Sequence, residues 1–144
     1  SLQAALSLSQ AAEFVDKYPE KAAHPIAQLG RNVSGGQKQR LSIARALARR
    51  PEILIFDDSF SALDYKTDAT LREGLAKQLP GTTKIIVAQR ISTIRHADQI
   101  LVLDRGEIAG LGTHDALMAS CTVYREIAMS QLSEEELKKG GASK

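Results

Sequence analysis

The fold class is decided by residues 52–58, which read Glu52-Ile53-Leu54-Ile55-Phe56-Asp57-Asp58. A continuous apolar run that ends in carboxylates is typical of a strand buried on both faces of a parallel sheet. A helical pattern follows over residues 66–79, a turn is expected at Pro80-Gly81, and a second apolar run occupies residues 84–88. Because strand, helix and strand alternate, the sequence predicts an α/β fold with a mostly parallel sheet and flanking helices.

Further elements are expected on both sides of this strand-helix-strand unit. Toward the C-terminus, Asp104-Arg105-Gly106 separates two apolar runs, 99–103 and 107–111, and this pattern predicts an antiparallel hairpin. Apolar residues at helical spacing predict helices over residues 3–17, 36–50, 115–118 and 122–131.

The composition is that of one globular domain, with 144 residues, 19 Lys and Arg against 17 Asp and Glu, and 43% hydrophobic residues. No apolar run approaches the ~20 residues that a membrane-spanning helix needs. The lone Cys121 excludes an internal disulfide, which favours a reducing compartment. Basic residues gather in the second helix, at Lys38, Arg40 and Arg45, and form either a face for a polyanion or the solvated side of that helix. Since no aromatic residues interleave with them, we expect no nucleic acid partner.

The segment Val33-Ser34-Gly35-Gly36-Gln37 lies just before this basic helix. Ser34 is a good N-cap, and the two glycines let backbone amides approach a ligand with no Cβ in the way. Free N–H groups at a helix N-terminus bind anions, and phosphate above all. An ordinary capped helix start is the alternative interpretation.

Two carboxylates, Asp57 and Asp58, leave the first strand at its C-terminal end, where open α/β sheets hold ligands. One of them can hold Mg²⁺ while the other polarises an attacking water, although a turn with two solvated acids has the same sequence. The loop Ser59–Asp64 follows at once, and Gln89 ends the next strand. Taken singly, these last two features indicate only a loop and a strand end.

Taken together and in this order, the motifs resemble the nucleotide-binding domain of ATP-binding cassette (ABC) transporters. Val33–Gln37 looks like its signature motif, Ile53–Asp58 like its Walker B strand, Ser61–Asp64 like its D-loop and Val87–Arg90 like its switch-histidine loop. Gly112-Thr113-His114 is similar to the segment after the switch loop in exporter-type members.

The resemblance implies two such domains that sandwich two ATP molecules, each with Mg²⁺. Ser34, Gly35, Gly36 and Gln37 would then bind the γ-phosphate side of an ATP held by the partner domain. Asp57 would serve the Mg²⁺ of this domain's own nucleotide, and Asp64 would lie at the dimer seam. The transmembrane domains of the same transporter would be further partners, at the cytoplasmic face of the cell membrane.

Two positions depart from the family pattern at the catalytic end. Asp58 stands where the family has a catalytic glutamate, and its carboxylate is one methylene too short to reach the attacking water well. Gln89 replaces the switch histidine and cannot carry a positive charge. Both changes imply a degenerate ATP site in one half of a heterodimeric bacterial multidrug exporter, while the signature motif, with Val33 for the usual Leu, serves the other site.

No phosphate loop of the form G-x-x-x-x-G-K-[ST] occurs in the sequence. The expected fold is therefore a partial P-loop NTPase, the C-terminal portion of the domain, with its N-terminal phosphate-loop part missing. Residues 1–50 would belong to the helical subdomain and residues 51–144 to the ATPase core. We expect ATPase activity in the full-length protein, and neither tight ATP binding nor hydrolysis in the isolated chain.

Two other functions stay open from the sequence. A soluble ABC-type ATPase acting on DNA or ribosomes would share the motifs, although such relatives usually carry coiled-coil insertions and no heptad run is visible here. A non-catalytic dimerisation module that only donates Ser34–Gln37 to a complete partner is the other alternative.

Overall fold

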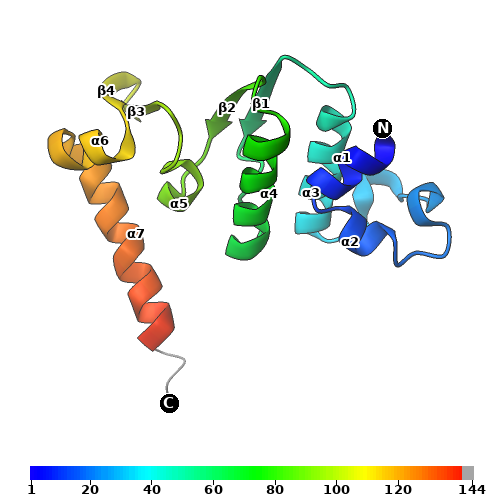
Figure 1. Cartoon of the computed structure of the whole chain (residues 1–144). Helices are drawn as coiled ribbons and strands as arrows, with labels where there is room; N and C mark the ends of the chain where they lie inside the picture. The colour runs from blue at the N-terminus through cyan, green and yellow to red at the C-terminus, as the bar shows by residue number, and fades with distance from the viewer. Residues whose placement is uncertain (141–144) are drawn as a thin grey trace. The chain divides into compact units, whose positions relative to one another are not determined.

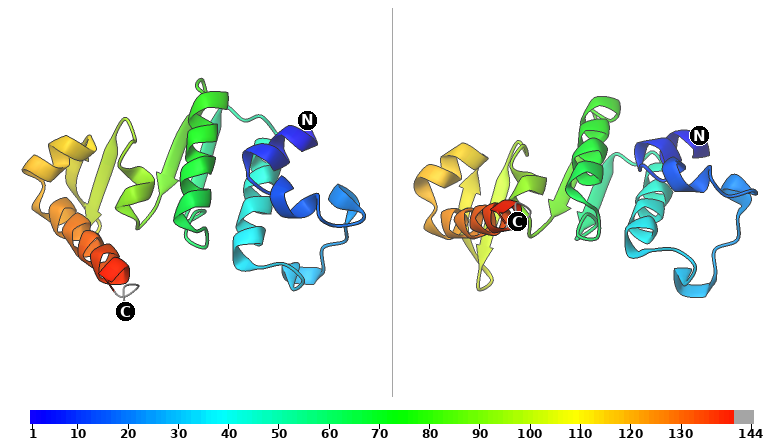
Figure 2. Two further views of the ribbon diagram at one scale, coloured as in Figure 1. Left: turned by 60° about the horizontal axis from the view of Figure 1, so that its bottom comes forward. Right: turned by 90° about the horizontal axis from the view of Figure 1, so that it is seen from below.

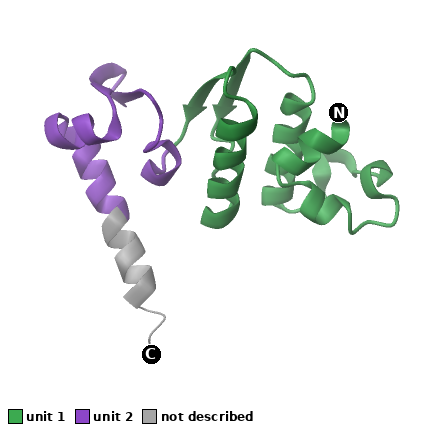
Figure 3. Ribbon diagram, viewed as in Figure 1, with its two compact units in different colours: residues 1–88 green, residues 89–144 purple. Residues whose placement is uncertain are grey.

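The computed structural model describes residues 1–140, and the side chains of residues 1–131. The chain forms two compact units, residues 1–88 and a second that begins at Gln89 (Figure 3). Each unit is described by itself. The division expected after residue 50 separates functional regions rather than compact units, and it stays a prediction.

The first unit holds a parallel strand pair. β1 (Ile53–Asp57) pairs with β2 (Thr83–Val87), in a register that places Ile53 opposite Thr83 and Asp57 opposite Val87. The crossover between the strands is α4 (Tyr65–Gln78), and Figure 2 shows this helix lying along the strand pair. The remaining elements are α1 (Leu2–Leu8), α2 (Ala12–Val15), the short 3-10 turns η1 (Lys21–Ala23) and η2 (Gln28–Gly30), and α3 (Gly35–Leu47) (Figure 1). The expected α/β class is confirmed.

The largest cluster of buried residues in the first unit joins α1, α3, β1, α4 and the loop after β1. Leu71 and Leu75 of α4 are 0% and 1% exposed, and they share this core with Phe56 and Phe60. The core therefore spans the boundary expected after residue 50. Its buried members are Ala5, Leu8, Ile43, Leu47, Leu54, Phe56, Phe60, Leu63, Leu71 and Leu75.

β1 is buried on one face rather than two, and no residue of β2 is fully buried. Leu54 and Phe56 are 3% and 2% exposed, whereas Ile53 and Ile55 are 58% and 67% exposed. Successive side chains of a strand point to opposite faces, and in the described part of the chain the core covers only the Leu54 face. The prediction of burial on both faces is therefore wrong for this structure.

The helix predicted over residues 3–17 is interrupted between α1 and α2. The Ser9 hydroxyl donates to the carbonyl of Leu6 (3.1 Å) and accepts from the amide of Ala11 (3.3 Å). Gln10 has a φ of 62°, which a right-handed α-helix does not accommodate. A buried serine that bonds to nearby backbone competes with the helical pattern, and this ends α1.

The second unit contains the predicted hairpin. β3 (Ile100–Asp104) and β4 (Glu107–Gly112) are antiparallel, with a register shift between Val102 and Leu103. Arg105 and Gly106 both have positive φ, 51° and 83°, as a two-residue type I′ turn requires. The helices are α5 (Ile91–Ile94), α6 (His114–Ser120) and α7 (Thr122–Gly140), so the last two are longer than predicted.

Candidate functional site

The start of α3 is a capping box that leaves two backbone amides for a ligand. Ser34 N–H donates to Oε1 of Gln37 (2.8 Å), and Gln37 N–H donates to Oγ of Ser34 (3.2 Å). The helical pattern begins with Lys38 N–H, which donates to the carbonyl of Ser34. The amides of Gly35 and Gly36 therefore have no acceptor within the helix. Anion binding at this end of the helix stays a prediction.

The two glycines also lie against the loop that follows β1. A Cβ built on Gly36 would be 3.0 Å from the carbonyl oxygen of Ala62, whereas one on Gly35 would meet the Ala62 Cβ at 3.8 Å. Gly36 thus lets the helix and the loop approach more closely than a larger residue would allow. The structure brings together the Ser34–Gln37 and Ser61–Asp64 segments, which are far apart in the sequence.

The acidic end of β1 is exposed and has an unusual backbone. The Asp57 and Asp58 side chains both face solvent, and Asp58 has a φ of 48°. Its amide donates to the carbonyl of Val87 (3.0 Å), and its carbonyl accepts from the hydroxyl of Ser61 (3.0 Å). A left-handed conformation is uncommon for a residue other than glycine, although aspartate adopts it more readily than most, and here the surrounding hydrogen bonds hold it.

A residue that sequence reasoning missed, Gln39 of α3, bonds to this same loop. Its Nε2 donates to the carbonyl of Asp58 (3.3 Å) and to Oγ of Ser61 (3.1 Å), and its Oε1 accepts from the amide of Ala62 (2.9 Å). Gln39 lies only two residues beyond Gln37, but nothing in the sequence shows that it reaches across to residues 58–62.

Asp64 is the N-cap of α4. Its Oδ1 accepts from the amide of Thr67 (2.8 Å) and its Oδ2 from the Thr67 hydroxyl (2.9 Å). These bonds, the backbone one foremost, hold the pKa of the Asp64 carboxyl below its ordinary value. The dimer-seam role that the family resemblance implies for Asp64 would have to be compatible with this capping role.

The residues at the end of β1 suit a magnesium ion that arrives with a nucleotide. Mg²⁺ is usually held by one or two carboxylates together with waters and substrate phosphates. Asp57 and Asp58 are adjacent, exposed carboxylates, while the described residues contain no group of three His, Cys, Asp or Glu that could hold a metal. The fit is therefore to a phosphate-bound ion rather than to a cage made by the protein alone.

Gln89 belongs to the second unit, where the C-terminal helix holds its backbone. Nε2 of Gln131 in α7 donates to the carbonyl of Gln89 (2.5 Å), and Oε1 of Gln131 accepts from the amide of Ile91 (2.8 Å). The Gln89 side chain is exposed. Gln131 was not predicted either, because no sequence signal connects two positions 42 residues apart.

One of the basic residues of α3 has a structural role. Arg40 donates through Nη1 to the Gln10 carbonyl (3.0 Å) and to the Glu13 carboxylate (2.8 Å), and its guanidinium lies 4.9 Å above the centre of the Phe14 ring. These contacts join α3 to α2. The Arg40 charge is thus committed within the first unit.

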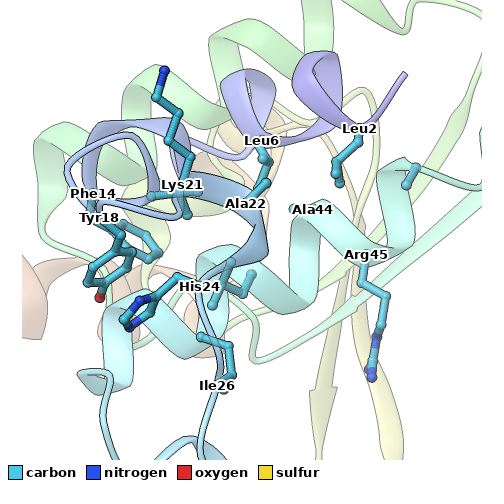
Figure 4. Close-up of a pocket in the computed structure, with 13 residues that line it drawn as sticks. Leu2, Leu6, Phe14, Tyr18, Lys21, Ala22, His24, Ile26, Ala44 and Arg45 are labelled. Atoms are coloured by element: carbon cyan, nitrogen blue, oxygen red, sulfur yellow. The ribbon is translucent and has the colours of Figure 1, made fainter.

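The first unit also contains a mainly apolar pocket of about 320 Å³, between α1, α2, α3 and the segment after α2 (Figure 4). The Tyr18 and His24 rings stack at its rim with centroids 3.9 Å apart, and His24 Nδ1 lies 3.0 Å from the Glu20 carboxylate. That hydrogen bond lowers the pKa of Glu20. None of the residues that line the pocket is among the predicted site residues.

In the part of the chain that the structure describes, no helix is both long and apolar enough to span a membrane.

Comparisons with known proteins agree with the motifs. The family model described as ABC transporter matches residues 5–61. A putative ABC transporter ATP-binding protein of Mycoplasma pneumoniae is 44% identical over 131 residues, which is 91% of this chain and 21% of the relative. Multidrug resistance protein 4 of Entamoeba histolytica is 42% identical over 130 residues, 90% of this chain and 10% of that protein.

A solved structure of a bacterial Atm1-family ABC exporter with ATP bound is also similar, with a TM-score of 0.87 and 36% sequence identity. The similarity covers 90% of this chain and 23% of the exporter chain. The chain spans about a fifth of the length of the Mycoplasma relative, and its mixed α/β units match part of the ATPase fold. From motif order, sequence identity and fold together, the chain belongs to the family of ABC transporter ATP-binding domains.

Proposed function

We propose that this chain works in the ATP-hydrolysing machinery of an ABC exporter at the cytoplasmic face of the membrane. It donates Ser34–Gln37 to an ATP molecule held by a second nucleotide-binding domain, and transmembrane domains of the same transporter are its other partners. The observation that carries this proposal is the start of α3, where the amides of Gly35 and Gly36 are left for an anion by the capping box. The likeness to an exporter structure with ATP bound supports it.

We further propose that the chain's own ATP site is degenerate. Asp57 would hold Mg²⁺, which when bound would neutralise charge on the phosphate oxygens. Asp58 orients water and accepts its proton poorly, because its carboxylate is one methylene shorter than the glutamate of the family pattern. Gln89 donates a hydrogen bond but no positive charge. Asp64 lies at the seam between the two domains.

An asymmetric pair of sites follows from these assignments. The second domain would supply the phosphate loop for the ATP that Ser34–Gln37 contacts, and would carry Glu and His at the positions of Asp58 and Gln89. We therefore propose a heterodimer. Within this chain, we propose that residues 1–50 belong to the helical subdomain and residues 51–144 to the ATPase core. The multidrug name of the Entamoeba relative supports drug-like cargo.

The test is site-resolved ATP hydrolysis by the assembled transporter. Ser34→Ala, which removes a ligand from the ATP that the partner holds, is expected to lower turnover at least about tenfold, or ~1.4 kcal/mol of transition-state stabilisation. In that background, Asp58→Glu with Gln89→His is expected to raise the remaining turnover by at least about tenfold, because it restores the acid and the switch residue.

The matched control for the acid is Asp16→Glu, which makes the same chemical change at an exposed residue after α2. This control is expected to leave both rates unchanged. The proposal of a degenerate site is wrong if Asp58→Glu with Gln89→His gives no gain over the control. The proposed role of Ser34 is wrong if Ser34→Ala hydrolyses ATP at the wild-type rate.

A further inference from the structure

We propose that Gln39 is a positioning residue that fixes the acidic end of β1 to the phosphate-binding start of α3. This inference rests on the proposed function, because it gives a role in hydrolysis to a contact within the first unit. Its side chain bonds to three residues of the loop after β1, namely Asp58, Ser61 and Ala62. Gln39 touches neither nucleotide nor metal in this scheme and acts through Asp58.

The contact requires a side-chain amide. One end of Gln39 donates to a backbone carbonyl, that of Asp58 (3.3 Å), and the other end accepts from a backbone N–H, that of Ala62 (2.9 Å). The polarity of both backbone groups is fixed, so the orientation of the amide is fixed as well. A carboxylate of the same size would keep the bond to Ala62 and lose the bond to Asp58.

Gln39 supports the backbone at Asp58, where the backbone conformation is unfavourable. Asp58 has a φ of 48°, and its peptide groups are held by Val87 on one side and by Ser61 and Gln39 on the other. The hydrogen bonds that hold the backbone of Asp58 therefore also set the direction of its side chain. A catalytic group displaced by about 1 Å loses much of its effect on the rate, because such reactions depend on orientation.

The link reaches the anion-binding end of the same helix. Gln39 lies in the second turn of α3, which begins with Gly35 and Gly36, and Gly36 packs against the carbonyl of Ala62. The loop is thus fixed to α3 at two points, one polar and one by close packing. Through them, a phosphate bound at Ser34–Gln37 and the acid Asp58 would be held by one connected piece of structure.

The loop has apolar anchors that do not depend on Gln39. Phe60 and Leu63 are 2% and 4% exposed and belong to the core of the first unit. Gln39 itself is half-buried at the surface of α3. Replacing it should therefore leave the unit folded and change mainly the placement of Asp58.

The test combines Gln39→Glu with the variant in which the acid is restored. In the assembled transporter carrying Ser34→Ala, Asp58→Glu and Gln89→His, adding Gln39→Glu is expected to remove most of the roughly tenfold gain in kcat. The KM for MgATP should stay within about twofold, since Gln39 contacts no nucleotide. Gln3→Glu, the same change at an exposed position of α1, is the control and should keep the gain.

The inference is overturned if the gain in kcat persists in Gln39→Glu, or if kcat falls only together with the unfolding midpoint. If Asp58→Glu with Gln89→His gives no gain in kcat even when Gln39 is intact, the proposal of a degenerate site is wrong, independently of Gln39. Gln39 is then judged on the 144-residue chain by amide hydrogen exchange. Gln39→Ala should speed exchange at Ala62 about tenfold or more, whereas Gln39→Glu should keep Ala62 protected. Equal exchange at Ala62 in wild type and Gln39→Ala would overturn the contact itself.

Discussion

The two glycines at the start of α3 allow a sharp test of how closely this helix approaches the loop after β1. Both Gly35→Ala and Gly36→Ala replace a glycine in the first turn of the same helix. Each change reduces the freedom of the unfolded chain and favours the helix by about 0.5–1 kcal/mol. The variants differ in what the new Cβ meets in the folded state.

At Gly35 the new methyl group would lie 3.8 Å from the Cβ of Ala62, an ordinary van der Waals distance. At Gly36 it would lie 3.0 Å from the Ala62 carbonyl oxygen, a backbone atom that moves only with the loop. Overpacking of this kind costs about 1–3 kcal/mol. We therefore expect Gly35→Ala to be as stable as wild type or more so, and Gly36→Ala to be less stable than Gly35→Ala by about 1–3 kcal/mol.

Urea denaturation of both variants, with a common m value, measures this difference directly. Thermal unfolding should show the same order, at about 3 °C for each kcal/mol in a chain of this length. If Gly36→Ala proves as stable as Gly35→Ala, the close approach of α3 to the loop is wrong. The packing contact between Gly36 and Ala62 would then not join the Ser34–Gln37 and Ser61–Asp64 segments.

The other predictions concern α4. Asp64→Ala should lower the unfolding midpoint at neutral pH. The difference in midpoint from wild type should shrink as the pH falls through the lowered pKa of Asp64, because a carboxyl with a depressed pKa stabilises the fold only while it is ionised. Thermal unfolding between about pH 2 and pH 7 measures this difference, and a difference that widens in acid would contradict the prediction. Asp68 is 1% exposed and its Oδ1 lies 2.6 Å from Nε of Arg72, so Asp68→Ala should lower the free energy of unfolding, measured in urea, by about 3–5 kcal/mol. Glu73→Ala breaks an exposed pair of the same spacing and should change the midpoint far less, so equal losses in the two variants would refute the distinction.

The sequence predicted the order and type of the elements well, because their signals are local. The apolar runs around Ile55 and Ile86, the Arg105-Gly106 turn and the Ser34 cap each appear in the structure. Local signals also misled in two places. Ser9 ended a helix whose apolar spacing continued, and β1 was covered on one face where its composition suggested two.

The candidate site was only partly predictable, for a physical reason. Ser34, Asp57 and Asp64 could be named because a cap, a strand end and a family motif each have a sequence pattern. Gln39 and Gln131 could not, because a glutamine that bonds to backbone 19 or more residues away has the same sequence signature as a solvated one. Only the fold shows which amide meets a carbonyl and an N–H together.

The central claim is that Ser34–Gln37 completes an ATP site held by a partner domain. The most direct measurement uses the partner domain that co-purifies with this chain in the assembled transporter. The rate of ATP hydrolysis by the separated partner is followed as the 144-residue chain is added to it. We predict a saturable rise in rate with the wild-type chain, and no rise with Ser34→Ala at the same concentration. A partner whose rate ignores the chain, or responds equally to Ser34→Ala, would contradict the account.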